Sequence, residues 1–566
     1  MDNPRIIQGL LFLCSLNVAA WACPVGCECK GDEMLCIGLS SVPPLSSSTT
    51  ALYFSSFNIA YLKAEDLTSL TNVITFAIDN TTLREVQPGT FDSPVNLKAL
   101  AVTGTELQDL PEALFQNLHL LETLNLNRNK LGLLHPKWFS TIKVLSHLDL
   151  SQNQLSSLPV EAFQPLTKLE YLMLSRNSIS QLFSETFKGL SKLKYLRLNK
   201  NLLRAIPSGC FDDLQNVEEL SLQDNMVTHL QHDLFSKTTK LTKLFLSNNQ
   251  LRTLPQGLLL HLPNLAQISL YENQLENLHP GVFGPMPLEE LWLYDNKLGR
   301  IEDYTFKNLT RLRLLVLSRN RISYVSPGAF QGLEQIGEIS LHTNLLETLQ
   351  AGTFQGLPGL VNISLEHNSI SYLPAGFLEG LSHLGQIDLR NNTLANLPQQ
   401  DLDALSVAEE VLLQQNPWRC DEDILPLRTW MRKHPLKVNQ SLVVCDTPLN
   451  LSGEIIALLR EEDLGEQSST QQTPLISTGN RRKPNIPPVK STSSPAVMTT
   501  SSSEYEVTRN GQGEEGHVPN YTSIILIVIA VVATIIISAT IIGCLYWRRN
   551  KRGQGHIGHR SRNSVL

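Results

Sequence analysis

The side chains with the most direct chemistry in this sequence are its cysteine thiols. The 566-residue chain holds nine cysteines, and six of them form two groups far apart in the sequence: Cys23, Cys27, Cys29 and Cys36, then Cys420 and Cys445. In an oxidising compartment outside the cytoplasm, these six predict three disulfides. A zinc site on the first four thiolates is the weaker alternative, because secreted proteins seldom keep such thiolates free. We therefore expect disulfides and no metal.

Motifs for catalysis are missing from the sequence. It contains no Gly-x-Ser-x-Gly nucleophile elbow, no His-Glu-x-x-His zinc motif and no glycine-rich phosphate loop. Cys210 stands where a later unit has the small residue Ala329, so we expect it to pack in a core and not to be reactive. We expect neither an enzyme nor a bound cofactor.

A repeat of about 24 residues, Leu-x-x-Leu-x-Leu-x-x-Asn-x-Leu, must position the remaining side chains. The residues from Leu121 to Leu131 are a clear copy. The asparagine recurs in thirteen slots at a constant step, which is shorter only before Asn296: Asn129, Asn153, Asn177, Asn201, Asn225, Asn249, Asn273, Asn296, Asn320, Asn344, Asn368, Asn392 and Asn416. Phe57, Thr81 and Thr105 occupy three earlier slots, so the first units are degenerate.

The period dictates how the units fold. Each Leu-x-Leu predicts a short strand with its leucines inward, and the asparagine amide can satisfy backbone groups in the turn that follows. A phenylalanine recurs midway through most units, as at Phe115 and Phe139, and we expect it to fill the convex side of the core. No unit can bury its apolar face alone, so the units stack. We expect an α/β solenoid of about 15 units over residues 51–415, with a parallel sheet on its concave face.

Outward residues of these strands are the candidates for binding. Phe245, Tyr271, Trp292 and Tyr294 fall on three successive strands, where large aromatics are typical of interface anchors. The alternative is that the rings pack against one another and stiffen the sheet. Arg176 and Arg197 belong to a basic set on earlier strands, and an acidic set that includes Glu272 and Glu290 follows, which favours an extended partner.

Both ends of the repeat carry motifs that identify a family. Cys23-Pro24-x-x-Cys27-x-Cys29 followed by Cys36 resembles the N-terminal cap of extracellular leucine-rich-repeat membrane proteins, and Asn416-Pro417-Trp418-Arg419-Cys420 with Cys445 resembles their C-terminal cap. The resemblance implies caps at residues 23–50 and 416–463. That C-terminal cap usually holds four cysteines; here Glu422 stands where a second would be.

The segments outside the caps predict a single-pass type I protein of the plasma membrane with its repeats outside the cell. Residues 1–22 read as a signal peptide, and 522–547 as a transmembrane helix that contains an uncharged run from Ile524 to Leu545. Arg548 and Arg549 place the following tail, 548–566, in the cytoplasm. Between cap and membrane, 464–521 is a Ser/Thr/Pro-rich stalk.

N-glycosylation sequons occur in the region expected outside the cell at Asn80, Asn308, Asn362, Asn391, Asn439 and Asn450. Asn362 and Asn391 flank the concave strands, so sugars there would restrict binding to earlier repeats.

Function is expected from the family resemblance. It implies a cell-surface adhesion protein that binds extracellular matrix proteins of the collagen, fibronectin and laminin class. The alternative is a ligand-binding subunit that joins another membrane receptor chain, as platelet glycoproteins of the family do. The carboxyl terminus Ser564-Val565-Leu566 fits a cytoplasmic PDZ protein. The chain is acidic outside its basic tail, with a net charge of -7 overall, which argues against nucleic acid as a partner.

Overall fold

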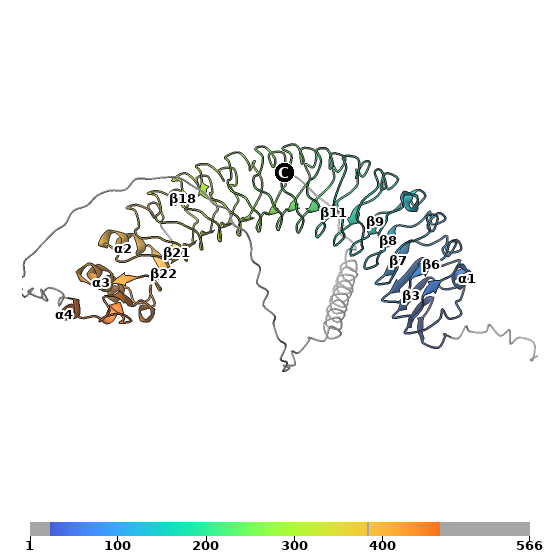
Figure 1. Cartoon of the computed structure of the whole chain (residues 1–566), viewed down its shortest axis with the longest axis horizontal. Helices are drawn as coiled ribbons and strands as arrows, with labels where there is room; N and C mark the ends of the chain where they lie inside the picture. Colours follow the sequence, from blue (N-terminus) through green and yellow to red (C-terminus); the bar gives the residue numbers. More distant parts are fainter. Residues whose placement is uncertain (1–22, 382–383, 465–566) are drawn as a thin grey trace, which may run out of the picture. The chain divides into compact units, whose positions relative to one another are not determined.

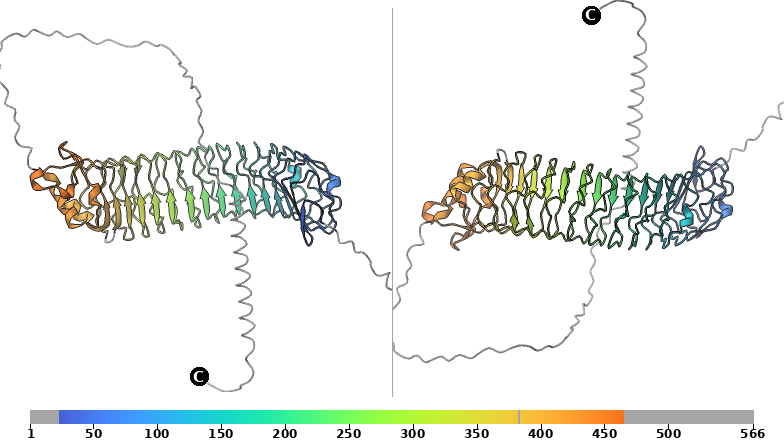
Figure 2. Two further views of the ribbon diagram at one scale, coloured as in Figure 1. Left: turned by 90° about the horizontal axis from the view of Figure 1, so that it is seen from below. Right: turned by 90° about the horizontal axis from the view of Figure 1, so that it is seen from above.

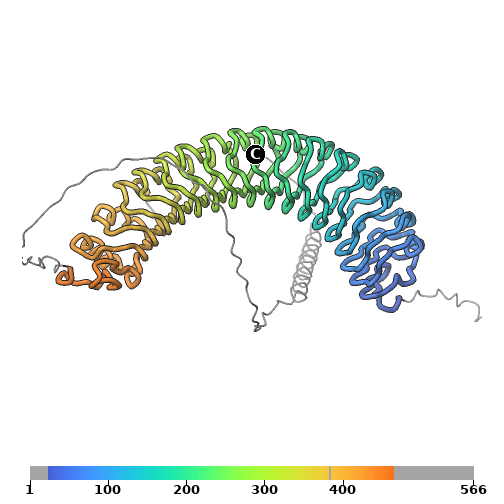
Figure 3. Tube along the Cα trace, viewed as in Figure 1, coloured from blue at the N-terminus to red at the C-terminus, as the bar shows by residue number. Residues whose placement is uncertain are grey.

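A computed structural model describes residues 23–381 and 384–464, and these form a curved β-solenoid (Figure 1). The chain coils in near-identical turns from one end to the other (Figure 3), and every turn places one strand on the inner, concave side. The predicted solenoid is therefore present. The signal peptide, most of the stalk, the transmembrane segment, the tail and its PDZ-type terminus lie outside the described residues.

One sheet of eighteen strands runs along the concave face. Its strands lie side by side across the solenoid (Figure 2) and are parallel, except that β1 and β2 are antiparallel. In order, the strands are β1 (Cys27–Lys30), β2 (Glu33–Ile37), β3 (Ala51–Ser55), β5 (Thr75–Asp79), β7 (Ala99–Thr103), β8 (Thr123–Asn125), β9 (His147–Asp149), β10 (Tyr171–Met173), β11 (Tyr195–Arg197), β12 (Glu219–Ser221), β13 (Lys243–Phe245), β14 (Gln267–Ser269), β15 (Glu290–Trp292), β17 (Leu314–Val316), β19 (Glu338–Ser340), β20 (Asn362–Ser364), β21 (Leu384–Asp388) and β22 (Ala408–Leu412). The sixteen strands from β3 to β22 exceed the predicted count of about 15 units by one and match the thirteen asparagine slots plus the three degenerate ones.

The convex side departs from the predicted α/β class. Within the described repeats, the only helices are α1 (Ala64–Leu67), the 3-10 helix η1 (Pro136–Phe139) and α2 (Gln399–Leu405), so most turns return without a helix. Two short strand pairs lie outside the concave sheet, β4 (Tyr61–Leu62) with β6 (Glu85–Val86) and β16 (Arg300–Ile301) with β18 (Tyr324–Val325). A repeat unit of this length leaves too few residues after the strand and its turn for a regular helix of ordinary length.

A continuous hydrophobic core fills the solenoid from cap to cap. The repeated leucines are buried, and the convex phenylalanines stack on one another from turn to turn. Ring centroids of consecutive members from Phe139 to Phe235 lie 5.8 to 6.4 Å apart. The row stops at Leu259 and resumes from Phe283 to Phe354. Cys210 is a free, buried thiol in this core, as its packing role predicts. Residues 23–464 thus contain a core of their own and are expected to fold alone.

The asparagine ladder satisfies the turns in the way that the sequence predicts. Asn249 is typical: its Nδ2 donates to Leu222 O at 3.0 Å and Leu246 O at 3.2 Å, and its Oδ1 accepts from Val227 N at 3.0 Å. Leu222 O also accepts from Asn225 Nδ2, so each shared carbonyl receives two amides from neighbouring turns. The ladder therefore ties successive turns together through buried hydrogen bonds.

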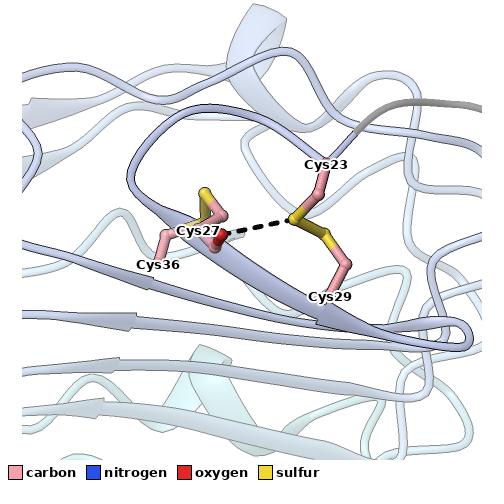
Figure 4. The surroundings of a disulfide bond; sticks show 4 residues. All are labelled: Cys23, Cys27, Cys29 and Cys36. Atoms are coloured by element: carbon pink, nitrogen blue, oxygen red, sulfur yellow. Dashed lines mark hydrogen bonds between the residues drawn. A yellow bond between two sulfur atoms is a disulfide. The ribbon is translucent and has the colours of Figure 1, made fainter.

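Disulfides close both ends of the solenoid. In the N-terminal cap, Cys23 pairs with Cys29 and Cys27 with Cys36, around the hairpin of β1 and β2 (Figure 4). In the C-terminal cap Cys420 pairs with Cys445, next to the short strands β23 (Trp418–Arg419) and β24 (Cys445–Thr447). The three predicted disulfides are therefore formed.

Arginines strengthen the C-terminal cap, which has only one disulfide. Its helices are η2 (Glu422–Ile424), α3 (Leu425–Lys433), η3 (Gln440–Leu442), η4 (Ile456–Leu458) and α4 (Glu461–Leu464). From α3, Arg432 Nε donates to Ala457 O at 2.6 Å and Arg432 Nη2 to Leu459 O at 2.7 Å. Buried Arg428 donates to the same Leu459 O at 3.1 Å. These charged donors hold the last described segment to the cap.

None of the helices within residues 23–381 and 384–464 is long and apolar enough to cross a membrane.

Candidate interaction surface

The concave sheet presents its outward side chains in columns. In each three-residue strand the central residue points into the core, while the first and third point outward and form the first and second columns. The residue two positions beyond the strand forms the third column. The next residue has a positive φ, as at Arg176 (55°), and forms the turn column at the edge of the sheet. Parallel register places equivalent residues of successive turns directly beside one another, such as Ser269 beside Trp292.

Three of the four predicted aromatic anchors meet in a cluster. The rings of Tyr271 and Tyr294, in the third column, stack at 4.6 Å with their planes 6° apart. Trp292, in the second column of β15, meets Tyr294 edge-on at 6.3 Å, and its Nε1 donates to Glu290 Oε2 at 3.2 Å. Burial raises the pKa of Tyr294, with a further contribution from Tyr271. The rings pack against one another, as the alternative interpretation predicts, and they remain partly exposed. Their use as interface anchors stays a prediction. We call Tyr271, Trp292 and Tyr294 the aromatic cluster.

Phe245 does not join the aromatic cluster. It ends β13 in the second column, with Ser269 of β14 between it and Trp292. Its ring is half-buried, and among the described residues no aromatic ring pairs with it.

The two arginines predicted to bind a ligand lie apart from the aromatic cluster, and they differ in whether they form an ion pair. Arg197 ends β11, and its Nη2 donates to Glu219 Oε1 at 3.0 Å. Arg176 is exposed in the turn column and forms no ion pair within the part of the chain that the structure describes. β11 and β15 are four strands apart, which corresponds to roughly 19 Å at the usual strand spacing.

A second aromatic row, missed at the sequence level, lies in the first column. His147 stacks on Tyr171 with ring centroids 4.2 Å apart, and Tyr171 stacks on Tyr195 at 4.7 Å. These three residues begin β9, β10 and β11, and each is separated from the next by one repeat unit in the sequence. That spacing is a signal in the sequence, but these residues precede the central leucine, whereas the predicted anchors all follow it. We call these three residues the tyrosine row.

Ion pairs between neighbouring turns reduce the predicted division of charge. Lys194 Nζ lies 2.8 Å from Glu170 Oε2, and this bond lowers the pKa of Glu170 and raises that of Lys194. Most other charges of the face are paired in the same way: Arg128 with Asp79, Arg197 with Glu219, Lys200 with Asp224, Arg313 with Glu289 and Arg319 with Asp295. Within the described residues Arg176, Glu272 and Glu290 have no ion pair, so they are among the charges that remain for a partner, as is exposed Lys243 at the start of β13.

The sequon asparagines occupy different parts of the molecule. Asn362 begins β20 in the first column, and Asn80 and Asn391 lie in the turn column. Asn308 is half-buried, with Nδ2 donating to Phe283 O at 2.9 Å. Asn439 and Asn450 are exposed in the C-terminal cap. Sugars at Asn362 and Asn391 would therefore stand over strands β20 and β21 and away from the aromatic cluster.

Across residues 23–381 and 384–464, no three His, Cys, Asp or Glu side chains gather in a way that could hold an ion.

Comparison with known families gives a clear match. The family model described as "Leucine rich repeat" matches nine overlapping segments, 71–131, 95–155, 121–179, 145–203, 167–227, 191–251, 239–291, 287–346 and 334–394. Together they cover residues 71–394 without a gap.

Matches to individual curated proteins are short. The chain is 33% identical over 55 residues to SLIT and NTRK-like protein 4 of Mus musculus, covering 10% of this chain and 7% of that protein. It is 42% identical over 45 residues to Leucine-rich repeat-containing protein 15 of Homo sapiens, covering 8% of each. It is 39% identical over 54 residues to the Platelet glycoprotein Ib beta chain of Rattus norvegicus, covering 10% of this chain and 26% of that protein. The chain thus spans about a quarter or less of each relative's length.

Among solved structures, the Toll–Spatzle complex of Drosophila in its glycosylated form is similar, with a TM-score of 0.58 at 21% identity. The alignment covers 76% of this chain and 71% of that one, and it supports the fold alone.

Proposed function

This chain belongs to the leucine-rich repeat family, and on that premise we propose that it is a cell-surface adhesion protein whose concave face binds extracellular matrix proteins. The expected ligands are of the collagen, fibronectin and laminin class, and binding would influence cell adhesion and migration. Solenoids of this family are typically scaffolds for protein interaction and not enzymes. The observation that carries the proposal is the aromatic cluster.

The aromatic cluster has the properties of an interface anchor. Tyr271, Trp292 and Tyr294 hold each other in fixed positions, so a partner that packs against them loses little side-chain freedom of this protein. Their rings are only half-buried. Tyrosine and tryptophan side chains of this kind dominate the energy of many protein interfaces, at about 2–4 kcal/mol for truncation of a central one.

The tyrosine row extends the candidate surface along the solenoid. It lies in the first column of β9 to β11, whereas the aromatic cluster lies in the second and third columns around β14 and β15. A ligand that contacts both crosses the sheet diagonally over several strands, at about 4.8 Å for each strand. This geometry favours an elongated partner, as a matrix protein is, over a compact one.

Two further observations support an extracellular face with this binding region. The disulfides of both caps fit an oxidising compartment. The sequons Asn362 and Asn391 lie beyond the aromatic cluster, so sugars there leave β9 to β15 open. The solved Toll–Spatzle complex, in which a protein of the same fold meets a protein partner, is in keeping with this use of the fold.

A receptor subunit is the alternative. The match to one chain of a platelet glycoprotein favours it, because this chain could likewise work together with another membrane receptor chain. Both functions use the repeats to bind a macromolecule. They differ in whether the repeats bind it alone or only together with a second membrane chain.

A binding experiment tests the proposal and separates it from the alternative. Residues 23–464, produced by mammalian cells, are applied to immobilised collagen, fibronectin and laminin. Saturable binding by the purified repeats supports matrix adhesion. Binding that requires a second chain on cells supports the receptor subunit, and a failure to bind any of the three matrix proteins rejects the matrix assignment.

A further inference from the structure

Two leucines project into solvent from one loop of the C-terminal cap. Leu436 is 96% exposed, and Leu442 is 54% exposed. They flank the sequon Asn439-Gln440-Ser441, one on either side of Asn439 at the same distance along the chain. An isolated exposed leucine is ordinary, but here two leucines leave apolar surface in water within three residues of the same sequon asparagine.

The loop is held firmly, so Leu436 cannot turn inward. Lys437 O accepts from Val411 N of β22 at 2.8 Å, and Lys437 Nζ donates to Ser406 O at 2.8 Å. Val438 is 3% exposed and anchors the loop in the core. Further along, Gln440 Nε2 donates to Met431 O of α3 at 2.5 Å. The exposure of Leu436 therefore follows from a fixed backbone.

Asn439 is arranged for attachment of a sugar. Its side chain is exposed, and Ser441 Oγ donates to its Oδ1 at 2.8 Å, so the hydroxyl of the sequon already contacts the amide. Within the described repeats and caps no acceptor pairs with Asn439 Nδ2. Two other sequons differ, because Asn308 Nδ2 donates to Phe283 O and Asn391 Nδ2 donates to Gln415 Oε1 at 2.7 Å.

We propose that Asn439 carries an N-linked glycan whose first sugars cover Leu436 and Leu442, and that this cover keeps the C-terminal cap from associating with a second copy of the chain. Asn439 is part of the lining of a shallow hollow formed by Glu410 and residues 435–441, and the first sugars can occupy this hollow. The apolar faces of the pyranose rings pack on the leucines, while their hydroxyls remain in water. This effect of the glycan on self-association of the cap does not depend on which ligand the concave face binds.

The modification is a group transfer from a lipid-pyrophosphate oligosaccharide. Asn439 Nδ2 forms a bond to C1 of the donor sugar, and the bond from C1 to the pyrophosphate oxygen breaks. One Nδ2 proton is lost to a base, and the lipid pyrophosphate leaves with the bonding electron pair. No oxidant or reductant takes part.

The test uses residues 23–464 from mammalian cells, with peptide mass spectrometry for occupancy and sedimentation velocity for self-association. Asn439→Gln and Ser441→Ala each remove the sequon, whereas Ser441→Thr keeps it and is the matched control. We expect the first two to shift from monomer to dimer or larger species, and Ser441→Thr to remain a monomer. Adding Leu436→Ser and Leu442→Ser to Asn439→Gln should restore the monomer.

Removal of the glycan from protein that has already folded separates loss of the cover from misfolding of the cap. Glycosidase treatment of the folded wild-type protein must reproduce the dimer, and the double leucine variant must prevent it. An unmodified Asn439 in the wild type overturns the proposal, as does a monomeric Asn439→Gln. Self-association of the fully glycosylated protein through Leu436 also overturns it and makes this face an interface between copies.

Discussion

Substitution of Asn249 by alanine tests how the asparagine ladder stabilises the solenoid. Asn249 is 7% exposed, and the change removes three donated bonds from Nδ2 and one accepted bond at Oδ1. Leu222 O and Leu246 O each keep a second donor from a neighbouring asparagine, so these carbonyls lose only about 0.5–1.5 kcal/mol each. Val227 N–H loses its acceptor while buried, at about 1–3 kcal/mol. The expected loss of unfolding free energy is about 2–6 kcal/mol.

The assay is guanidinium unfolding of residues 23–464, followed by hydrogen exchange. Gln250→Ala is the control, because its exposed side chain should contribute within about 0.5 kcal/mol. Because each turn contacts only its neighbours, amide protection in Asn249→Ala should fall first around β12 to β14. Unfolding of Asn249→Ala at the same denaturant concentration as Gln250→Ala, or protection that falls evenly along the chain, would show that the ladder does not stabilise the solenoid in this way.

Three further predictions concern buried or bridging side chains. Burial lowers the pKa of His342, so the unfolded state binds a proton there more readily and stability falls as the pH drops below about 6.5. His342→Asn should therefore reduce the loss of unfolding free energy between about pH 7 and 5.5. An unchanged dependence of the unfolding free energy on pH would count against this. Burial raises the pKa of the Cys210 thiol to about 12, so mass spectrometry should find it unlabelled by a thiol reagent at neutral pH until the protein unfolds; rapid labelling of the native protein would contradict its burial. Arg432→Met removes the two hydrogen bonds to Ala457 O and Leu459 O, at a cost of about 1.5–3 kcal/mol in local stability. Limited proteolysis should then show faster cleavage near residue 460. Cleavage at the wild-type rate would show that the arginine does not hold the segment.

Periodic residues made most of the fold predictable. The asparagine at each turn needs a fixed place in the backbone, so its spacing predicted the strands, their parallel order and the ladder that Asn249 represents. The convex side was harder, because a buried phenylalanine such as Phe163 packs equally well from a helix or from a turn. The convex segments, where the predicted α/β class implies helices, are therefore mostly turns, as the residues between β10 and β15 show.

The candidate surface was predictable only in part. Tyr271, Trp292 and Tyr294 were found because they follow the central leucines, whereas Tyr171 and Tyr195 precede them and were missed although they recur with the period of the repeat. Charge was harder to read from the sequence. Pairs such as Glu170 with Lys194 form between neighbouring turns, so the net charge of a strand says little about the charge that a partner meets.

We propose above all that the aromatic cluster on the concave face binds a matrix ligand. The most direct measurement compares binding of residues 23–464 to immobilised collagen, fibronectin and laminin for the wild type, Trp292→Ala and Tyr294→Ala. Tyr372→Ala is the control, because Tyr372 is 58% exposed and lies outside the cluster. We expect the cluster variants to bind at least one of these proteins roughly 30-fold or more weakly, as loss of about 2 kcal/mol implies, while Tyr372→Ala binds normally. Full binding by both cluster variants, or equal weakening by Tyr372→Ala, would contradict it.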